Sequence, residues 1–320
     1  MLKFFWGSNT GKGSVNYAKD FYPSAKRRIM IKGGPGTGKS SFMNRVANIA
    51  KEPVFFYCAS APQSLDAVAD YALGYFISDA TSPHILEPNL PGVRDEIMDF
   101  GRFLKREKLI KNQVAIEKAF AITKQHFNLA YASLAKALII RTELEKSTEP
   151  LAKKHYLKLW DELRELSGVR YKEDLGNKEK RFISAYTPQG LKRLEIKADK
   201  TYLISVSPSL TPTFLDPLAE LFIGSGYDSW FFMDPLDGSS YEGLYIPEAK
   251  IYLQVKWPEI KKTTNELLEN LAREEESGIA ELNRAFLAHE ELEKLYIEAM
   301  DFMALNEYLQ NFIEDLLGAD

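Results

Sequence analysis

The chain has 320 residues, of which 45% are hydrophobic and 27% are charged. This composition is typical of a folded globular protein and excludes collagen-like, low-complexity and intrinsically disordered chains. The length predicts about two domains. The net charge of −4 argues against a nucleic-acid coat, and the single cysteine excludes an intramolecular disulfide. Because no apolar run is long enough to span a bilayer, we expect a cytoplasmic protein with no membrane partner.

A glycine-rich phosphate-binding motif lies near the N-terminus. It matches G-x-x-x-x-G-K-[ST] between a short apolar strand, 29–31, and a helical apolar pattern that begins at Phe42. Glycines let backbone N–H groups converge on phosphate oxygens, and the N-terminus of a helix attracts the same anion. We therefore expect a nucleotide, ATP above all, to be bound by Gly33, Gly34, Pro35, Gly36, Thr37, Gly38, Lys39, Ser40 and Ser41.

Three side chains are assigned roles at this motif. Lys39 is expected to reach the β- and γ-phosphates, and the Ser40 hydroxyl is expected to bind Mg²⁺. A second magnesium ligand is usually a carboxylate that ends an apolar strand. Asp79 follows the run 73–78 and Asp234 follows the run 230–233, so both are candidates. Asp79 is preferred as the catalytic metal ligand because an internal alignment places Asp234 in a second copy of the fold.

The segments between the motif and residue 100 are expected to complete an α/β core. Strands are predicted over 54–58 and 73–78, with a loop or short helix over 59–70. The following loop, 79–92, contains three prolines and lies where ligands bind in open α/β sheets. Asp66 is a candidate catalytic residue that positions water or Mg²⁺, and His84 is a candidate that contacts the γ-phosphate or gates the site. The alternatives are a helix-start carboxylate for Asp66 and a loop histidine bonded to backbone for His84.

Two long segments have a helical pattern. The first runs from about 95 to 166 with a break near Pro150, and the second runs from 260 to 317. Their apolar stripes are expected to pack on each other as a hairpin or bundle. The alternative is a surface for a protein partner or for self-association. The sequence leaves open whether Arg94, Arg102 or an arginine of another subunit acts on the γ-phosphate.

The chain contains two copies of one plan of elements. Without gaps, residues 55–57 align with 231–233, which places Asp66 opposite Glu242 and Cys58 opposite Asp234. Further upstream, segment 202–223 repeats the strand, loop and helix of the phosphate motif. There Lys39 lies opposite Pro212, and Ser40 lies opposite Thr213. Because the second loop lacks the glycines and the lysine, we expect only the first copy to bind phosphate.

The chain resembles a family of uncharacterised bacterial ATPases built from tandem P-loop halves. The resemblance is carried by the motif 32–41, by the stretches 57–66 and 79–97, and by 180–190 in the second half. It implies a P-loop NTPase fold, three-layer α/β/α with a mainly parallel sheet, duplicated, with long helical extensions. The expected domains are an active core over 1–100, a helical insertion over 101–175, a degenerate half over 176–258 and a C-terminal helical segment over 259–320. Unlike family members with two intact motifs, this chain has one.

These features favour one function over two others. The favoured function is Mg²⁺-dependent ATP binding and hydrolysis coupled to a conformational change or to a partner. The first alternative is a nucleotide or small-molecule kinase, which would need arginines gathered around an acceptor pocket. The second is a non-catalytic nucleotide-dependent switch or scaffold, suggested by the degenerate second half.

Overall fold

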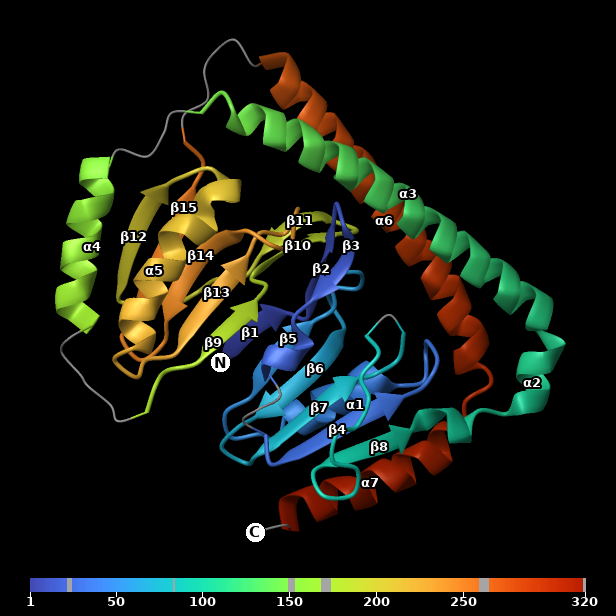
Figure 1. Ribbon diagram of the computed structural model, residues 1–320. Helices are drawn as coiled ribbons and strands as arrows, with labels where there is room; N and C mark the ends of the chain where they lie inside the picture. Colours follow the sequence, from blue (N-terminus) through green and yellow to red (C-terminus); the bar gives the residue numbers. More distant parts are fainter. Residues whose placement is uncertain (22–24, 83, 149–152, 168–173, 259–264, 319–320) are drawn as a thin grey trace.

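The computed structural model describes residues 1–320 apart from 22–24, 83, 149–152, 168–173, 259–264 and 319–320. Two β-sheets lie at its centre, and two long helices run together along one side of them (Figure 1). The chain is therefore an α/β protein with long helices. The helix break expected at Pro150 falls outside the described residues.

The first sheet is mixed. Its strand order is β1-β5-β6-β7-β4-β8, with β6 antiparallel to both neighbours and the other pairs parallel. The expected mainly parallel sheet is wrong because the connections on either side of β6, residues 58–64 and 71–74, are too short for the crossover that parallel strands need. The expected loop or short helix over 59–70 is likewise wrong where β6 forms. The strands are β1 (Leu2–Phe5), β4 (Arg27–Lys32), β5 (Val54–Tyr57), β6 (Leu65–Asp70), β7 (Tyr75–Asp79) and β8 (Asp95–Asp99).

The second sheet repeats five strands of the first. Its order, β12-β15-β14-β13-β9, corresponds to β4-β7-β6-β5-β1, and β14 is again the strand antiparallel to both neighbours. The pairing register slips between Phe56 and Tyr57 in the first sheet and between Phe232 and Met233 in the second. The aligned residues therefore carry the same β-bulge. The strands are β9 (Lys178–Arg181), β12 (Lys200–Ser205), β13 (Ser229–Met233), β14 (Tyr241–Ile246) and β15 (Ile251–Lys256).

In each half an equivalent hairpin follows the first strand of the sheet, which is β1 in the first half and β9 in the second. In the first hairpin the Thr10 hydroxyl donates to the carbonyl of Gly13, and in the second the Thr187 hydroxyl donates to the carbonyl of Gly190. The two sheet edges meet where the Phe5 N–H donates to the Phe182 carbonyl at 2.8 Å. The hairpin strands are β2 (Gly7–Thr10), β3 (Gly13–Asn16), β10 (Ser184–Thr187) and β11 (Gly190–Arg193).

The two sheets pack face to face, which gives layers in the order α/β/β/α. Along β13, Phe232 packs against the first sheet, whereas its neighbours Phe231 and Met233 pack in the core of the second half. The outer face of the first sheet is covered by α1 (Lys39–Ala47) and α7 (Phe302–Gly318). The outer face of the second sheet is covered by α5 (Thr211–Ile223), and α4 (Lys153–Ser167) packs against α5. The expected α/β/α sandwich is wrong because one crossover helix per half leaves a second apolar sheet face to cover.

The two long helices form the expected helical hairpin. Helices α3 (Gln113–Glu145) and α6 (Asn265–Ile297) run antiparallel, with His126 bonded to Glu281 and Gly278 packed on Leu134. The first helical segment begins later than expected, because Asp95–Asp99 pairs with β4 as β8. Short helices fill the connections: η1 (Ala18–Phe21), η2 (Phe100–Phe103), α2 (Arg106–Lys111) and η3 (Pro208–Leu210). None of the helices among the described residues has the length and apolar character to cross a membrane.

Candidate functional site

The loop that joins β4 to α1 is shaped by glycines. Gly36 and Gly38 have φ angles of 66° and 88°, a left-handed conformation that side-chain-bearing residues rarely adopt. Helix α1 begins directly after them at Lys39, so its unpaired N–H groups face the loop. The Thr37 hydroxyl donates to the carbonyl of Gly34 at 2.8 Å and braces the turn. The motif therefore has the strand–loop–helix context that phosphate binding requires.

Lys39 and Asp79 lie side by side at the end of the first sheet. Asp79 ends β7 and pairs with Ile31 of β4, so parallel pairing brings its carboxylate to the start of the loop. The Lys39 Nζ donates to the carbonyls of Gly33 and Gly34 at 2.9 and 2.7 Å and lies 3.5 Å from Asp79 Oδ2. Asp234 instead lies in the second half, where Arg141 Nη1 donates a hydrogen bond to Asp234 Oδ1 at 2.8 Å.

Ser40 and Ser41 have different environments. The Ser40 Oγ accepts a hydrogen bond from the Leu65 N–H at 2.8 Å, which places it on the inner side of α1 beside β6. Ser41 is exposed on the outer side. Thr81, which the sequence analysis did not single out, joins the loop to β7: its hydroxyl donates to the Gly33 carbonyl at 2.9 Å, and its N–H donates to Asp79 at 2.8 Å.

Asp66 and His84 meet beside this loop, together with Cys58. Asp66 is the extra residue of the β6 bulge, and bulges redirect a side chain in this way. Its Oδ2 lies 3.3 Å from His84 Nε2. Burial raises the pKa of Asp66, the His84 imidazole acts in the opposite direction, and Asp79 raises it further. Burial also raises the pKa of the Cys58 thiol. The sequence analysis did not single out Cys58 as a functional residue.

The last turns of α6 cover the loop. A Cβ at Gly34 would lie 2.7 Å from the Tyr296 ring, and a Cβ at Gly36 would lie 2.7 Å from the Glu293 carbonyl oxygen. The Glu293 carboxylate lies 3.5 Å from His289 Nε2. Its pKa is lowered by His289, by Lys39 and by the nearby Gly36 N–H. A carboxylate of α6 therefore lies beside the Gly36 N–H and the Lys39 ammonium of the loop.

The second half has a shorter loop at the equivalent place. The Tyr241 N–H donates to the Thr211 Oγ1 at 2.8 Å, as the Leu65 N–H does to Ser40. Ser40 therefore corresponds to Thr211, and the expected pairing with Thr213 is wrong. The reason is length: Ser40 lies eight positions after β4 ends at residue 32, and Thr211 lies six positions after β12 ends at residue 205.

A carboxylate also covers this shorter loop. The Ser209 N–H donates to Glu145, near the C-terminal end of α3, at 3.2 Å. Glu293 occupies the corresponding place on the first loop, near the C-terminal end of α6. Each long helix therefore follows one half in the chain and ends on the loop of the other half.

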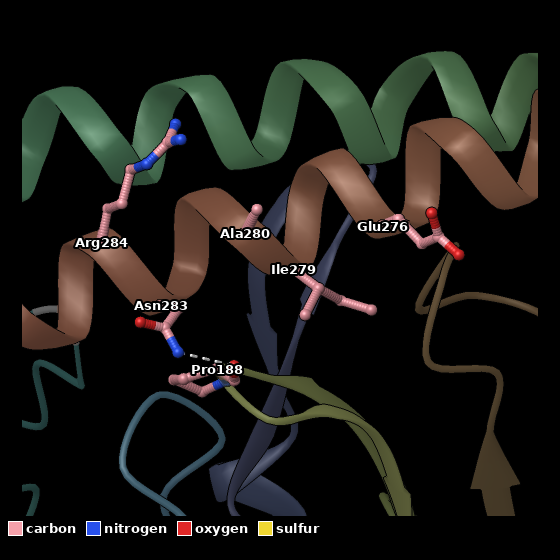
Figure 2. Close-up of a pocket in the computed structure, with 6 residues that line it drawn as sticks. All are labelled: Pro188, Glu276, Ile279, Ala280, Asn283 and Arg284. Carbon is pink, nitrogen blue, oxygen red and sulfur yellow. Dashed lines mark hydrogen bonds between the residues drawn. The ribbon is translucent and has the colours of Figure 1, made fainter.

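A separate surface pocket lies between α6 and the β10–β11 turn (Figure 2). The Asn283 side chain donates to the Pro188 carbonyl across it at 3.3 Å. None of the residues predicted to bind nucleotide lines this pocket, so it is a feature of the second half and α6. Its lining residues are Pro188, Glu276, Ile279, Ala280, Asn283 and Arg284.

Comparisons with protein-family models, with curated proteins and with solved structures find no match for this chain.

Proposed function

We propose that the first half of the chain is a P-loop NTPase core that binds Mg²⁺–ATP at the Gly33–Ser40 loop and hydrolyses it. The observation that carries this proposal is the position of Lys39 within 3.5 Å of Asp79, directly after two left-handed glycines and at the N-terminus of α1. A plain glycine-rich turn needs neither a partly buried lysine nor a carboxylate from the neighbouring parallel strand. P-loop hydrolases use both.

Each residue of the proposed site would have a distinct role in nucleotide binding and hydrolysis. The loop N–H groups would hold the phosphates, and Lys39 would neutralise charge on the β- and γ-phosphates. Ser40 and Asp79 would hold Mg²⁺, which would neutralise charge on the triphosphate. The Asp66–His84 pair would orient the attacking water. The water oxygen would bond to the γ-phosphorus as the bond to the β–γ bridging oxygen breaks, and the water proton would pass to this pair.

We infer further that the two halves arose as a tandem repeat and that the second has no phosphate site. The common strand order and the common bulge support the repeat. In the second loop a 3₁₀ turn with Pro208 replaces the glycines, and proline removes an N–H donor.

Phosphate release from ATP and GTP by the purified chain, with and without Mg²⁺, tests the proposed function. We expect turnover of ATP that requires Mg²⁺ and needs no added acceptor. Tight binding without turnover would instead favour a switch, or a kinase that requires an acceptor hydroxyl. Absence of nucleotide binding at millimolar concentration would contradict the proposal.

A Glu293→Gln substitution is expected to tighten nucleotide binding. The glutamine keeps the shape of the side chain but removes a negative charge that competes with the triphosphate for Gly36 and Lys39. Because the Glu293 side chain is 41% exposed and screened by solvent, we expect a gain on the order of threefold in affinity. Titration with a fluorescent ATP analogue at low ionic strength measures it.

Glu291→Gln is the matched control for this effect. It lies on the same helix, its side chain is 67% exposed, and it pairs with Lys294 rather than with the loop. Equal affinities for the Glu293→Gln variant, the Glu291→Gln variant and the unsubstituted protein would show that Glu293 does not compete with nucleotide.

A further inference from the structure

Three potential metal ligands from different segments converge at the end of the first sheet. Cys58 follows β5, Asp66 is the bulged residue of β6, and His84 lies in the loop after β7. One ligand atom of each, a sulfur, a carboxylate oxygen and an imidazole nitrogen, lies within 4.8 Å of both others. These three strands are neighbours in the sheet, so the fold itself brings the side chains together.

Two atoms of this cluster are buried without a hydrogen-bond partner in the described part of the chain. They are Asp66 Oδ2 and His84 Nδ1. Asp66 is 6% exposed, and its Oδ2 is the oxygen that lies nearest His84. Burying polar atoms without a well-formed hydrogen bond is costly, and a cation bound beside Asp66 Oδ2 would remove that cost for the carboxylate.

The second half supplies a cation of its own at the equivalent place. There Asp234 corresponds to Cys58, and the Arg141 guanidinium lies 2.8 Å from both carboxylate oxygens of Asp234. Where α3 contacts the first half, it contributes Tyr131 instead of an arginine, and the Tyr131 hydroxyl donates to Asn9. The same position in the fold thus contains an arginine in one half and a cluster of metal-ligand side chains in the other.

We propose that Cys58, Asp66 and His84 form a binding site for a transition-metal ion, with Zn²⁺ the best match. Thiolate, imidazole and carboxylate are the donors that zinc prefers, and three protein ligands leave a fourth position for water. A tetrahedral zinc site separates its ligand atoms by about 3.3–3.8 Å, so closure from the observed spacing needs only side-chain movements. When the metal–sulfur bond forms, the thiol proton is released to solvent. With the metal bound, Asp66 and His84 act as its ligands and no longer accept the proton of the attacking water, so the two roles are alternatives for this pair. The metal assignment does not depend on nucleotide hydrolysis.

Cobalt titration of the metal-free full chain, without nucleotide, tests this site. We expect saturation at about one Co²⁺ per chain, with visible bands of a tetrahedral site and a thiolate-to-cobalt charge-transfer band, all removed by Zn²⁺. Because Cys58 is the single cysteine in the sequence, no other side chain of the protein can produce that charge-transfer band. Absence of the band in the unsubstituted protein would overturn the proposal without any variant.

Ligand variants make the assignment specific. Cys58→Ser should abolish the charge-transfer band, and Cys58→Ser and His84→Ala should each weaken Zn²⁺ binding on the order of 100-fold in competition with a chromophoric chelator. His126→Ala is the matched control, since His126 bonds to Glu281 between the long helices and lies outside the cluster. Unchanged Zn²⁺ affinity in both ligand variants would overturn the proposal, because the ion would then bind elsewhere.

Discussion

Replacing Lys39 with alanine is expected to reduce Mg²⁺-dependent ATP hydrolysis by at least about 100-fold. Lys39 is the motif lysine expected to contact the β- and γ-phosphates, and removing one charge-stabilising donor from a catalytic site typically costs about two to three orders of magnitude in rate. The folded state should survive, because the Lys39 ammonium is bonded to loop carbonyls and is not part of the core. Steady-state phosphate release and thermal unfolding of the same samples measure the two quantities.

Lys51→Ala is the matched control for Lys39→Ala. Lys51 is exposed just beyond α1, so the substitution removes the same charge from the same half without touching the loop. Its hydrolysis rate should equal that of the unsubstituted protein. If Lys39→Ala hydrolyses ATP as fast as Lys51→Ala does, the activity does not come from the Gly33–Ser40 loop.

Replacing Arg141 with alanine is expected to destabilise the folded protein strongly. The Arg141 side chain is 7% exposed and lies 2.8 Å from Asp234 and 3.2 Å from Asp237. Removing it leaves two buried carboxylates without their cation, which typically costs about 3–5 kcal/mol of unfolding free energy. For a chain of this length that is a fall of roughly 5–8 °C in Tm. Urea and thermal unfolding measure it.

Two further variants separate unpaired charge from lost packing. Arg284→Ala removes an arginine whose side chain is 59% exposed from its pair with Glu281, which keeps its contact with His126, and we expect a loss of at most about 1 kcal/mol. In an Arg141→Met background, Asp234→Asn should recover part of the stability because it removes one of the unpaired charges. A loss for Arg141→Ala as small as that for Arg284→Ala would contradict a structural role for this ion pair.

The loop and its carboxylate could be predicted from sequence because both signals are local. The spacing of glycines requires left-handed backbone, and Gly36 and Gly38 adopt it. Asp79 could be preferred to Asp234 because the internal alignment placed Asp234 after β13, remote from the loop. The same alignment failed by two residues at Thr211, since a gapless comparison cannot detect a loop that has been shortened.

Other residues of the site gave no signal in the sequence. Glu293 and Tyr296 fit an ordinary amphipathic helix, and only the docking of α6 places them on the loop. Cys58 follows a buried strand, a position that many small residues occupy, so its sequence context does not mark it as a ligand. It becomes a potential ligand because β6 turns back beside β5 and its bulge directs Asp66 to the same side.

By itself the sequence determined the α/β class, the phosphate-loop motif, the repeated order of elements and the pairing of the long helices. These depend on short periodic patterns and on backbone angles that a few residues fix. The tertiary structure alone decided that β6 and β14 run antiparallel, that the two sheets meet face to face, and that each long helix ends on the opposite loop. Those features depend on which apolar faces pack against each other. A sequence pattern can show that a face is apolar, but it does not show which other face covers it.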